Sequence, residues 1–428
     1  MKLNISVQRE GQYYDIGAIE TLPGVGGIFS YDQSWLDDPA AKPLSLSFPL
    51  QKEPFPERKI RPYFEGLLPE ADARKSVARE VGVSSNSYLK LISALGFECI
   101  GALLIVDSDN EELSSELHPR YKEFSQKDFD DLSRLGYGKA GEIIADTRLS
   151  LAGGQSKVGL YHDPESDSWW LPMGTAPSNY IAKPYSNRFP SLIENELFCL
   201  SLARVCGIKT VNARKANTEY PLLLIERYDR VRSDLANDIE GHPFYARLHQ
   251  EDFAQALGII PAKKYEEHAS SKYLAKMADL LRRFSEDAAA DLYSLFELQL
   301  FNYLIGNCDA HCKNFSIIRD ASWQMLRLAP AYDLVSTTLY PELSRVMGMY
   351  IGSERKIDYI TKDHFLELAR EINIAPKLAN RCIEEICEKI TDESILSACE
   401  NETSETIYQG VIVRVNQLCA KGESRSLD

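Results

Sequence analysis

The chain has 428 residues, of which 44% are hydrophobic and 26% are charged. This length exceeds one ordinary hydrophobic core, so we expect a soluble globular protein of two or three packed units. The formal net charge of −15 argues against unaided binding of nucleic acid, because a phosphate backbone rewards positive charge, although a local basic patch stays possible.

The cysteines and the lack of long apolar runs predict the cellular compartment of the protein. The nine cysteines are odd in number and irregularly spaced, which predicts reduced thiols in a cytoplasmic protein. The first residues lack the apolar core of a signal peptide. No apolar run approaches the roughly 18 residues of a membrane span, so we expect no membrane contact. The histidines form no HExxH pair, and no zinc site is predicted.

Residues 1–106 predict a small α+β unit. Short strands precede turn and proline signals, and helical stretches follow them. The expected strands and helices are Leu3–Val7, Tyr13–Ile19, Tyr63–Leu68 and Asp72–Val81. The acidic run at 107–112 predicts a solvated linker or turn after this unit.

Residues 107–227 are β-rich in their second half, with one long helix. Strand-like segments between turn signals and the apolar run Pro221–Glu226 predict the strands, and apolar residues at helical spacing predict the helix. The expected strands are Lys157–His162, Ser168–Met173, Ser178–Lys183, Thr210–Ala216 and Pro221–Glu226, and the helix is Leu192–Val205.

Residues 228–428 predict a mainly helical third domain. Its clearest helix is Asp291–Ile305, whose broad apolar stripe is typical of a buried helix. The predicted domains are therefore 1–106, 107–227 and 228–428.

The segment after that helix carries the chemistry. Asp309 and Asn314 form the pattern D-x-x-x-x-N, in which an aspartate takes the proton of an attacking hydroxyl and the asparagine holds Mg²⁺. Asp333 comes 19 residues after Asn314, beyond an expected hairpin of Ser316–Ile318 and Met325–Leu328. That is the place of a second metal-binding carboxylate in a kinase.

Three upstream features agree with phosphate transfer from ATP. The loop Ser150–Lys157 contains Gly153 and Gly154, where backbone N–H groups can approach phosphates. Lys183 ends an expected strand, and Glu196 lies on the inward face of the following helix. A Lys–Glu pair would fix the lysine against the α- and β-phosphates.

Each feature also has a purely structural explanation. The glycines could form an ordinary turn, Lys183 and Glu196 could be surface charges, and Asp333 could cap a helix. Cys308, His311 and Cys312 are too close in sequence to surround one metal ion, and the role of His311 stays open. The order of loop, lysine, glutamate, Asp/Asn and aspartate favours a kinase.

These segments resemble the HipA family of kinases. Ser150–Lys157 is similar to the S-x-A-G-x-Q-x-K loop of that family, and Asp309–Ser316 is similar to its D-x-H-x-K-N-F-S signature. Pro43–Leu50, Tyr63–Glu70 and the pair Gly96 and Gly101 resemble segments of its first domain. The likeness covers residues from about 40 to 340, with several long segments in the same order.

The resemblance implies an α+β, two-lobed protein-kinase-like fold with a β-rich N-terminal lobe, an extra N-terminal subdomain and an all-helical C-terminal lobe. It implies a serine/threonine kinase that uses ATP and Mg²⁺. Asp309 would be the catalytic base, Asn314 and Asp333 the metal ligands, Glu196 the residue that orients Lys183, and Ser150 the site of silencing autophosphorylation. The implied ATP-binding residues are Ala152, Gly153, Gly154, Gln155, Ser156, Lys157, Lys183, Glu226, Tyr228, His311 and Lys313.

The resemblance also implies partners. A HipB-like helix-turn-helix antitoxin would carry the kinase to operator DNA, and the protein substrate would be an aminoacyl-tRNA synthetase, with the glutamyl enzyme the best-known case. One departure is Ser156, where the family loop usually has glutamate; its hydroxyl could be a second autophosphorylation site.

Two other functions stay open. A catalytically silent co-repressor that binds ATP without transfer would keep the same fold. A small-molecule kinase of the aminoglycoside type also uses D-x-x-x-x-N, but a histidine usually stands two residues before its aspartate, where this chain has Asn307.

Overall fold

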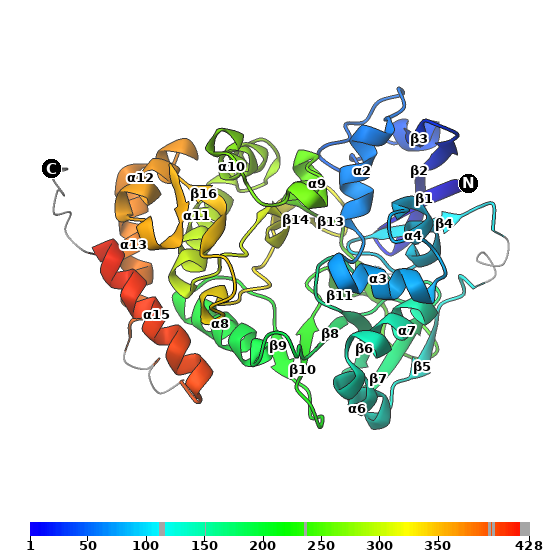
Figure 1. Cartoon of the computed structure of the whole chain (residues 1–428). Coiled ribbons are helices and arrows are strands. Elements are labelled where there is room, and N and C mark those ends of the chain that lie inside the picture. Colours follow the sequence, from blue (N-terminus) through cyan, green and yellow to red (C-terminus); the bar gives the residue numbers. More distant parts are fainter. Residues whose placement is uncertain (111–115, 150, 235–237, 393–394, 396–398, 420–428) are drawn as a thin grey trace. The chain divides into compact units, whose positions relative to one another are not determined.

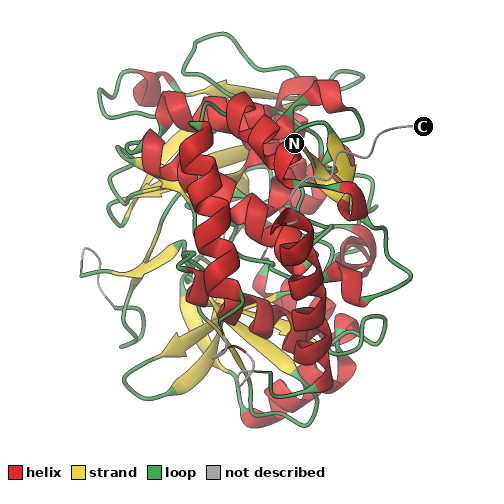
Figure 2. Ribbon diagram, turned by 90° about the vertical axis from the view of Figure 1, so that its left-hand side faces the viewer, coloured by secondary structure: helices red, strands yellow, loops and turns green. Residues whose placement is uncertain are grey.

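The computed structural model describes residues 1–110, 116–149, 151–234, 238–392, 395 and 399–419. They form two compact units in which strands and helices are mixed (Figures 1 and 2). The first unit comprises Met1–Asn187, Val211–Lys263 and Ser316–Ala329, and the second comprises Arg188–Thr210, Lys264–Phe315 and Pro330–Asp428. The division into three domains at residues 106 and 227 stays a prediction.

The first unit opens with an antiparallel sheet in the order β3-β2-β1-β4 (Figure 1). Both expected strands lie inside β1 and β2, and both expected helices correspond to α2 and α3. The elements are β1 Lys2–Arg9, β2 Gln12–Leu22, β3 Gly26–Tyr31, β4 Leu103–Asp107, α1 Gln33–Leu36, α2 Glu57–Gly66, α3 Ala71–Glu80 and α4 Tyr88–Leu95. Alternating residues of β1 pack into the core, where Leu3, Ile5 and Val7 are fully buried.

A hairpin from far along the chain completes this core. Its strands are β14 Ser316–Arg319 and β15 Leu326–Leu328, close to the expected hairpin. Trp323 in its turn is fully buried, donates its indole N–H to Gln8 O at 2.9 Å, and stacks on His249 with ring centroids 4.3 Å apart. The segment that joins Asn314 to Asp333 is therefore anchored in the N-terminal core.

A second sheet of the first unit has the order β5-β7-β6-β8-β10-β9. Its strands are β5 Arg120–Glu123, β6 Val158–Asp163, β7 Ser168–Met173, β8 Tyr180–Pro184, β9 Ala213–Lys215 and β10 Leu222–Glu226. Helices α6 Gln126–Leu135 and α7 Tyr137–Thr147 contribute to the core of this sheet. A reciprocal capping box between Ser125 and Asp128 fixes the start of α6.

The remaining elements of the first unit are short. They are β11 Arg230–Arg232, β12 Tyr245–Arg247, β13 Gln250–Asp252, α9 Phe253–Leu257 and the 3₁₀ turn Pro261–Lys263. Strand β13 pairs with β14, so the anchored hairpin extends into a three-stranded sheet.

The second unit is built mainly from helices (Figure 1). Its helices are α8 Leu192–Cys206, α10 Tyr273–Phe284, α11 Ala288–Ile305, α12 Lys362–Glu371, α13 Pro376–Ile390 and α15 Glu402–Cys419. Its short 3₁₀ turns are Ala269–Ser271, Cys312–Asn314, Thr337–Leu339 and Ile357–Tyr359. Helix α11 is buried on nearly all sides, as its apolar stripe predicts.

The expectation of an all-helical C-terminal lobe needs a correction. Residues 228–428 also contain strands, among them the hairpin β16 Val346–Ile351 and β17 Glu354–Lys356 of the second unit. The hairpin is explained by its contact with the loop after α11. Its backbone packs directly on that loop, and three residues of β16 are buried: Met347, Gly348 and Met349. Among the described residues, no helix is long and apolar enough to cross a membrane.

Glu251 on β13 holds the loop of Ser45 and Leu46. Its carboxylate accepts the Ser45 hydroxyl at 2.5 Å and the Leu46 N–H at 2.9 Å. Burial raises the pKa of Glu251 to about 7 despite these hydrogen bonds. The folded protein therefore binds this proton more tightly than the unfolded chain does.

We expect this burial to make stability depend on pH. A raised carboxyl pKa means that stability falls as pH rises from about 4.5 toward 7, by at most about 3 kcal/mol. Glu251→Gln should flatten this fall, because the amide does not ionise. Urea unfolding at pH 5, 6, 7 and 8 measures it, with the exposed Glu53→Gln as the control. Equal pH slopes for wild type and Glu251→Gln would show that Glu251 is ionised in the folded protein.

Candidate active site

The predicted catalytic loop begins where α11 ends. Gly306 terminates the helix with a φ of 75°, a left-handed conformation that favours glycine. A Cβ atom at Gly306 would lie 2.2 Å from Thr338 Oγ1, so a larger residue would displace the neighbouring segment. The chain therefore leaves α11 in one defined direction.

Close contacts within the second unit then fix the backbone of the loop. The N–H of Cys308 donates to Thr337 Oγ1 at 2.8 Å. Strand β16 approaches so closely that a Cβ atom at Gly348 would lie 2.6 Å from Ala310 O. A loop held from two sides suits residues that must be positioned for chemistry.

Asp309 and Asn314 emerge from the same turn. The side-chain amide of Asn314 donates to the backbone oxygen of Asp309 at 3.0 Å. Because the amide nitrogen faces the backbone, the amide oxygen points the other way, and oxygen is the ligand atom that Mg²⁺ prefers. The Asp309 side chain is 52% exposed, so an acceptor hydroxyl can reach it.

Asp333 lies on a loop beside this turn. Its backbone oxygen accepts a hydrogen bond from Asn307 Nδ2 at 3.4 Å, and the phenol of neighbouring Tyr332 donates to Lys313 O at 2.9 Å. Asp333 has a φ of 50°, which is uncommon for a residue with a side chain. Residues in such strained backbone conformations cluster at functional sites. The predicted base and both predicted metal ligands thus lie on neighbouring loops of one unit.

Two further loop residues are buried. His311 is 4% exposed and Lys313 is 7% exposed. The His311 ring meets the Tyr265 ring edge to face, with centroids 5.0 Å apart. His311 therefore packs against Tyr265, and contacts of His311 and Lys313 with ATP stay predictions.

Glu196 lies on α8 and is 2% exposed. The preceding residue, Asn195, exchanges two hydrogen bonds with the backbone of Ser336, at 3.0 and 2.8 Å. These bonds tie the helix that carries Glu196 to the segment that follows Asp333.

Lys183 lies on β8 of the first unit, opposite Leu223 of β10, and is 2% exposed. A lysine this deeply placed is rarely a mere surface charge. Glu196 belongs to the second unit, so the pairing of Lys183 with Glu196 stays a prediction.

The glycine-rich loop is partly held in the first unit. Gly153 has a φ of 117° and accepts the Glu70 N–H on its oxygen at 2.9 Å. The Lys157 ammonium donates to Ala152 O at 2.9 Å and curls over the loop. The φ of 117° explains the glycine, because a residue with a side chain rarely adopts this conformation.

The rest of this loop differs in exposure. Gly154 is exposed, Gln155 is half-buried, and Ser156 is 2% exposed. The Ser156 hydroxyl would therefore have to move before it could accept a phosphate. Ser150 lies outside the described residues.

Glu226 is the last residue of β10, and Tyr228 lies two residues beyond it. The exposed Glu226 carboxylate accepts the Asn212 amide at 2.8 Å. The Tyr228 phenol donates to Gln250 Oε1, and burial raises the pKa of this phenol above its ordinary value. Contact of either residue with adenine stays a prediction.

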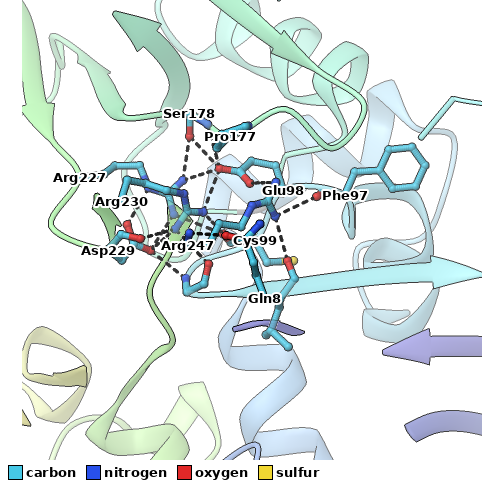
Figure 3. A network of polar contacts seen from close by, with 12 residues as sticks. Gln8, Phe97, Glu98, Cys99, Pro177, Ser178, Arg227, Asp229, Arg230 and Arg247 are labelled. Carbon is cyan, nitrogen blue, oxygen red and sulfur yellow. Dashed lines mark hydrogen bonds and ion pairs between the residues drawn. The ribbon is translucent and has the colours of Figure 1, made fainter. Parts of the chain in front are cut away.

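The residues on either side of Tyr228 in the sequence belong to a buried network of charged side chains (Figure 3). Arg227 bridges Asp229 at 2.8 Å and Glu98 at 3.1 Å, and Glu98 also pairs with Arg230 at 3.0 Å and Arg247 at 2.6 Å. All five side chains are at most 3% exposed. The network joins the segment between α4 and β4, which contains Glu98, to the segment of Tyr228.

Sequence reasoning missed this network because charged residues are usually exposed. The signal available was the close spacing of Arg227, Asp229 and Arg230. Burial alone would raise the pKa of Asp229, but the two flanking guanidinium groups hold it well below its usual range.

Two family models match this chain. Residues 149–394 match the HipA-like C-terminal domain, and residues 12–106 match the HipA N-terminal domain. The chain belongs to the HipA family.

Similar proteins agree with this assignment. The HipA-family chain is 37% identical to the Sinorhizobium fredii protein Y4mE over 379 residues, which is 87% of each protein. It is 29% identical over 338 residues to the serine/threonine-protein kinase toxin HipA of Shewanella oneidensis, covering 76% of this chain and 73% of that protein.

A solved structure gives the fold. The structure of the Shewanella oneidensis HipA, HipB and operator DNA complex matches with a TM-score of 0.74 and 23% identity, and the match covers 97% of each chain. The HipA-family chain therefore has the α+β kinase-like fold that its sequence predicts.

Proposed function

We propose that this chain is an ATP- and Mg²⁺-dependent serine/threonine protein kinase and the toxin of a HipBA-type module. Support comes above all from the hydrogen bonds that join the loops of Asp309, Asn314 and Asp333 in a chain of the HipA family. These residues supply a carboxylate base and oxygen ligands, the chemistry that phosphate transfer needs.

In the proposed reaction each residue has one role. The Asp309 carboxylate accepts the proton of the acceptor hydroxyl as its oxygen attacks the γ-phosphorus, and the bond to the β–γ bridging oxygen breaks to release ADP. Lys183, oriented by Glu196, and the loop Ala152–Lys157 bind the phosphates. Asn314 and Asp333 would hold Mg²⁺, which neutralises phosphate charge when bound. Glu226, Tyr228, His311 and Lys313 complete the ATP contacts.

The proposed kinase silences itself through Ser150. A phosphate there adds nearly two negative charges to the loop that binds ATP phosphates, so repulsion opposes a second round of binding. We therefore expect Ser150→Ala to remove most autophosphorylation and to prolong activity toward other proteins.

A labelling experiment with this variant tests the proposed function directly. Dephosphorylated chain is incubated with Mg²⁺ and γ-labelled ATP, and mass spectrometry maps the phosphate. Ser166→Ala, at an exposed hydroxyl of the same unit outside this loop, is the matched control. A phosphate on Ser156 alone would contradict the Ser150 assignment, and ATP binding without any transfer would favour a silent co-repressor.

The proposed partners follow from the same family. A HipB-like antitoxin would bring the chain to operator DNA, which suits a protein whose own net charge is −15. The proposed substrate is an aminoacyl-tRNA synthetase, whose phosphorylation would stop translation and arrest growth. Running the labelling reaction with glutamyl-tRNA synthetase tests this: label on the synthetase and loss of charging support it, and label on other proteins alone contradicts it.

A further inference from the structure

Tyr265 contacts the proposed catalytic base, although no sequence pattern marks it. Its phenol donates a hydrogen bond to Asp309 Oδ1 within the second unit. We propose that Tyr265 is a positioning residue that holds the Asp309 carboxylate in its catalytic orientation. This inference rests on the proposed kinase function, in which Asp309 is the base.

The position of the Asp309 carboxylate decides whether it can meet the acceptor hydroxyl. Its side chain is 52% exposed, so hydrogen bonds to the carboxylate add to the restraint that packing gives. Asn307 and Asn314 hydrogen-bond to the backbone of Asp309. His311 Nε2 lies 4.0 Å from Oδ1, beyond hydrogen-bond distance. The Tyr265 bond therefore acts on the part of Asp309 that must meet the acceptor hydroxyl.

Tyr265 is itself held on both sides along the chain. The oxygen of Lys264 accepts the Cys312 thiol at 3.3 Å, and the N–H of Glu266 donates to Gly348 O at 2.8 Å. Cys312 belongs to the catalytic loop, and Gly348 packs directly beneath it. The backbone of Tyr265 is thus fixed to the same loop that carries Asp309.

The neighbouring side chains add further restraint. The Glu266 carboxylate is 1% exposed and accepts the N–H groups of Tyr273 and Tyr350, each at 2.9 Å. The Lys264 ammonium lies 5.5 Å from the centre of the Tyr265 ring, and the His311 ring meets that ring at 5.0 Å. These contacts favour a fixed holder over a gate that swings away for each substrate.

The Asp309 carboxylate can bind the Tyr265 phenol and the acceptor hydroxyl at the same time. A hydrogen bond from a phenol to an ionised carboxylate is short and stronger than one between neutral groups. A carboxylate offers about four lone-pair positions, so Asp309 can keep the Tyr265 bond while it accepts the proton of the acceptor hydroxyl. Catalysis depends on such alignment, because small misplacements of a base cost rate.

Tyr265→Phe tests the inference with the full chain and its own autophosphorylation. The variant keeps the ring and removes only the hydroxyl. We expect the limiting rate at saturating Mg²⁺-ATP to fall roughly tenfold, while the KM for ATP stays within about twofold. The thermal midpoint should stay unchanged. Tyr359→Phe, at an exposed phenol of the same unit, is the matched control.

Three outcomes would overturn the inference alone while the wild type transfers phosphate. An unchanged rate would show that the hydroxyl has no positioning role, and a faster rate would show that Tyr265 obstructs the base. A lower midpoint with an unchanged rate for each folded molecule would reduce Tyr265 to a stabilising residue. If the wild type transfers no phosphate, the proposed function fails and the inference fails with it.

Discussion

Asp309→Asn should lower the rate of phosphate transfer by about three orders of magnitude. The amide has nearly the shape of the carboxylate and can still accept the Tyr265 hydrogen bond, but it cannot take the proton of the acceptor hydroxyl. Asn314 bonds to the backbone oxygen of Asp309, so that contact survives the substitution. ATP binding and the thermal midpoint should therefore stay close to those of the wild type.

Initial rates of labelled phosphate transfer, beside calorimetric ATP binding, measure this effect. Asp287→Asn is a matched control: Asp287 caps α11 in the same unit, and asparagine caps a helix equally well. Retention of more than about a tenth of the wild-type rate in Asp309→Asn would remove Asp309 from the role of general base.

Glu98→Gln should destabilise the first unit by about 3–5 kcal/mol. Glu98 is buried against Arg227, Arg230 and Arg247, and its charge offsets theirs. Burial alone would raise the pKa of Glu98, but the three guanidinium groups hold it below its usual range. Removing the charge leaves Arg227 and Arg230 with Asp229 as an anionic partner and takes away the Arg247–Glu98 ion pair (Figure 3).

Urea unfolding at pH 7 measures the loss for Glu98→Gln. The contribution of a lowered carboxyl pKa is present above the unfolded pKa and disappears as pH falls, so the difference between wild type and variant should shrink in acid. Glu165→Gln is the control, because its ion pair with Arg232 is exposed, and we expect no measurable change there. An equally small effect of Glu98→Gln would show that the network is not stabilised by this charge.

Local patterns predict much of the fold. The return strand expected at Ser168–Met173 after a turn signal corresponds to β7, and the apolar stripe of Asp291–Ile305 lies inside α11, because turn signals and apolar spacing are properties of short segments. Helices α6 and α7 were not predicted, since their polar faces obscure the apolar stripe in the sequence. The β16–β17 hairpin was missed because the contact that explains it is long-range: Gly348 packs against Ala310 in the loop after α11.

The candidate site was predictable in part. The D-x-x-x-x-N pattern and the later aspartate could be read from spacing, and the structure brings their loops together. Tyr265 lies 44 positions before Asp309, and Glu98 lies 129 positions before Arg227, so no local pattern connects either pair. Likewise Trp323 reads as a turn residue until its burial beside Gln8 is known.

One measurement tests the central claim most directly. Phosphatase-treated chain is mixed with γ-labelled ATP, with and without Mg²⁺, beside Asp309→Asn, and the protein-bound label is counted and mapped. Kinase activity predicts label on the wild type only when Mg²⁺ is present, and almost none on the variant. If no label appears on the wild type despite confirmed ATP binding, with every candidate protein acceptor present, the kinase assignment is contradicted. A nucleotide-binding co-repressor would then remain as the function.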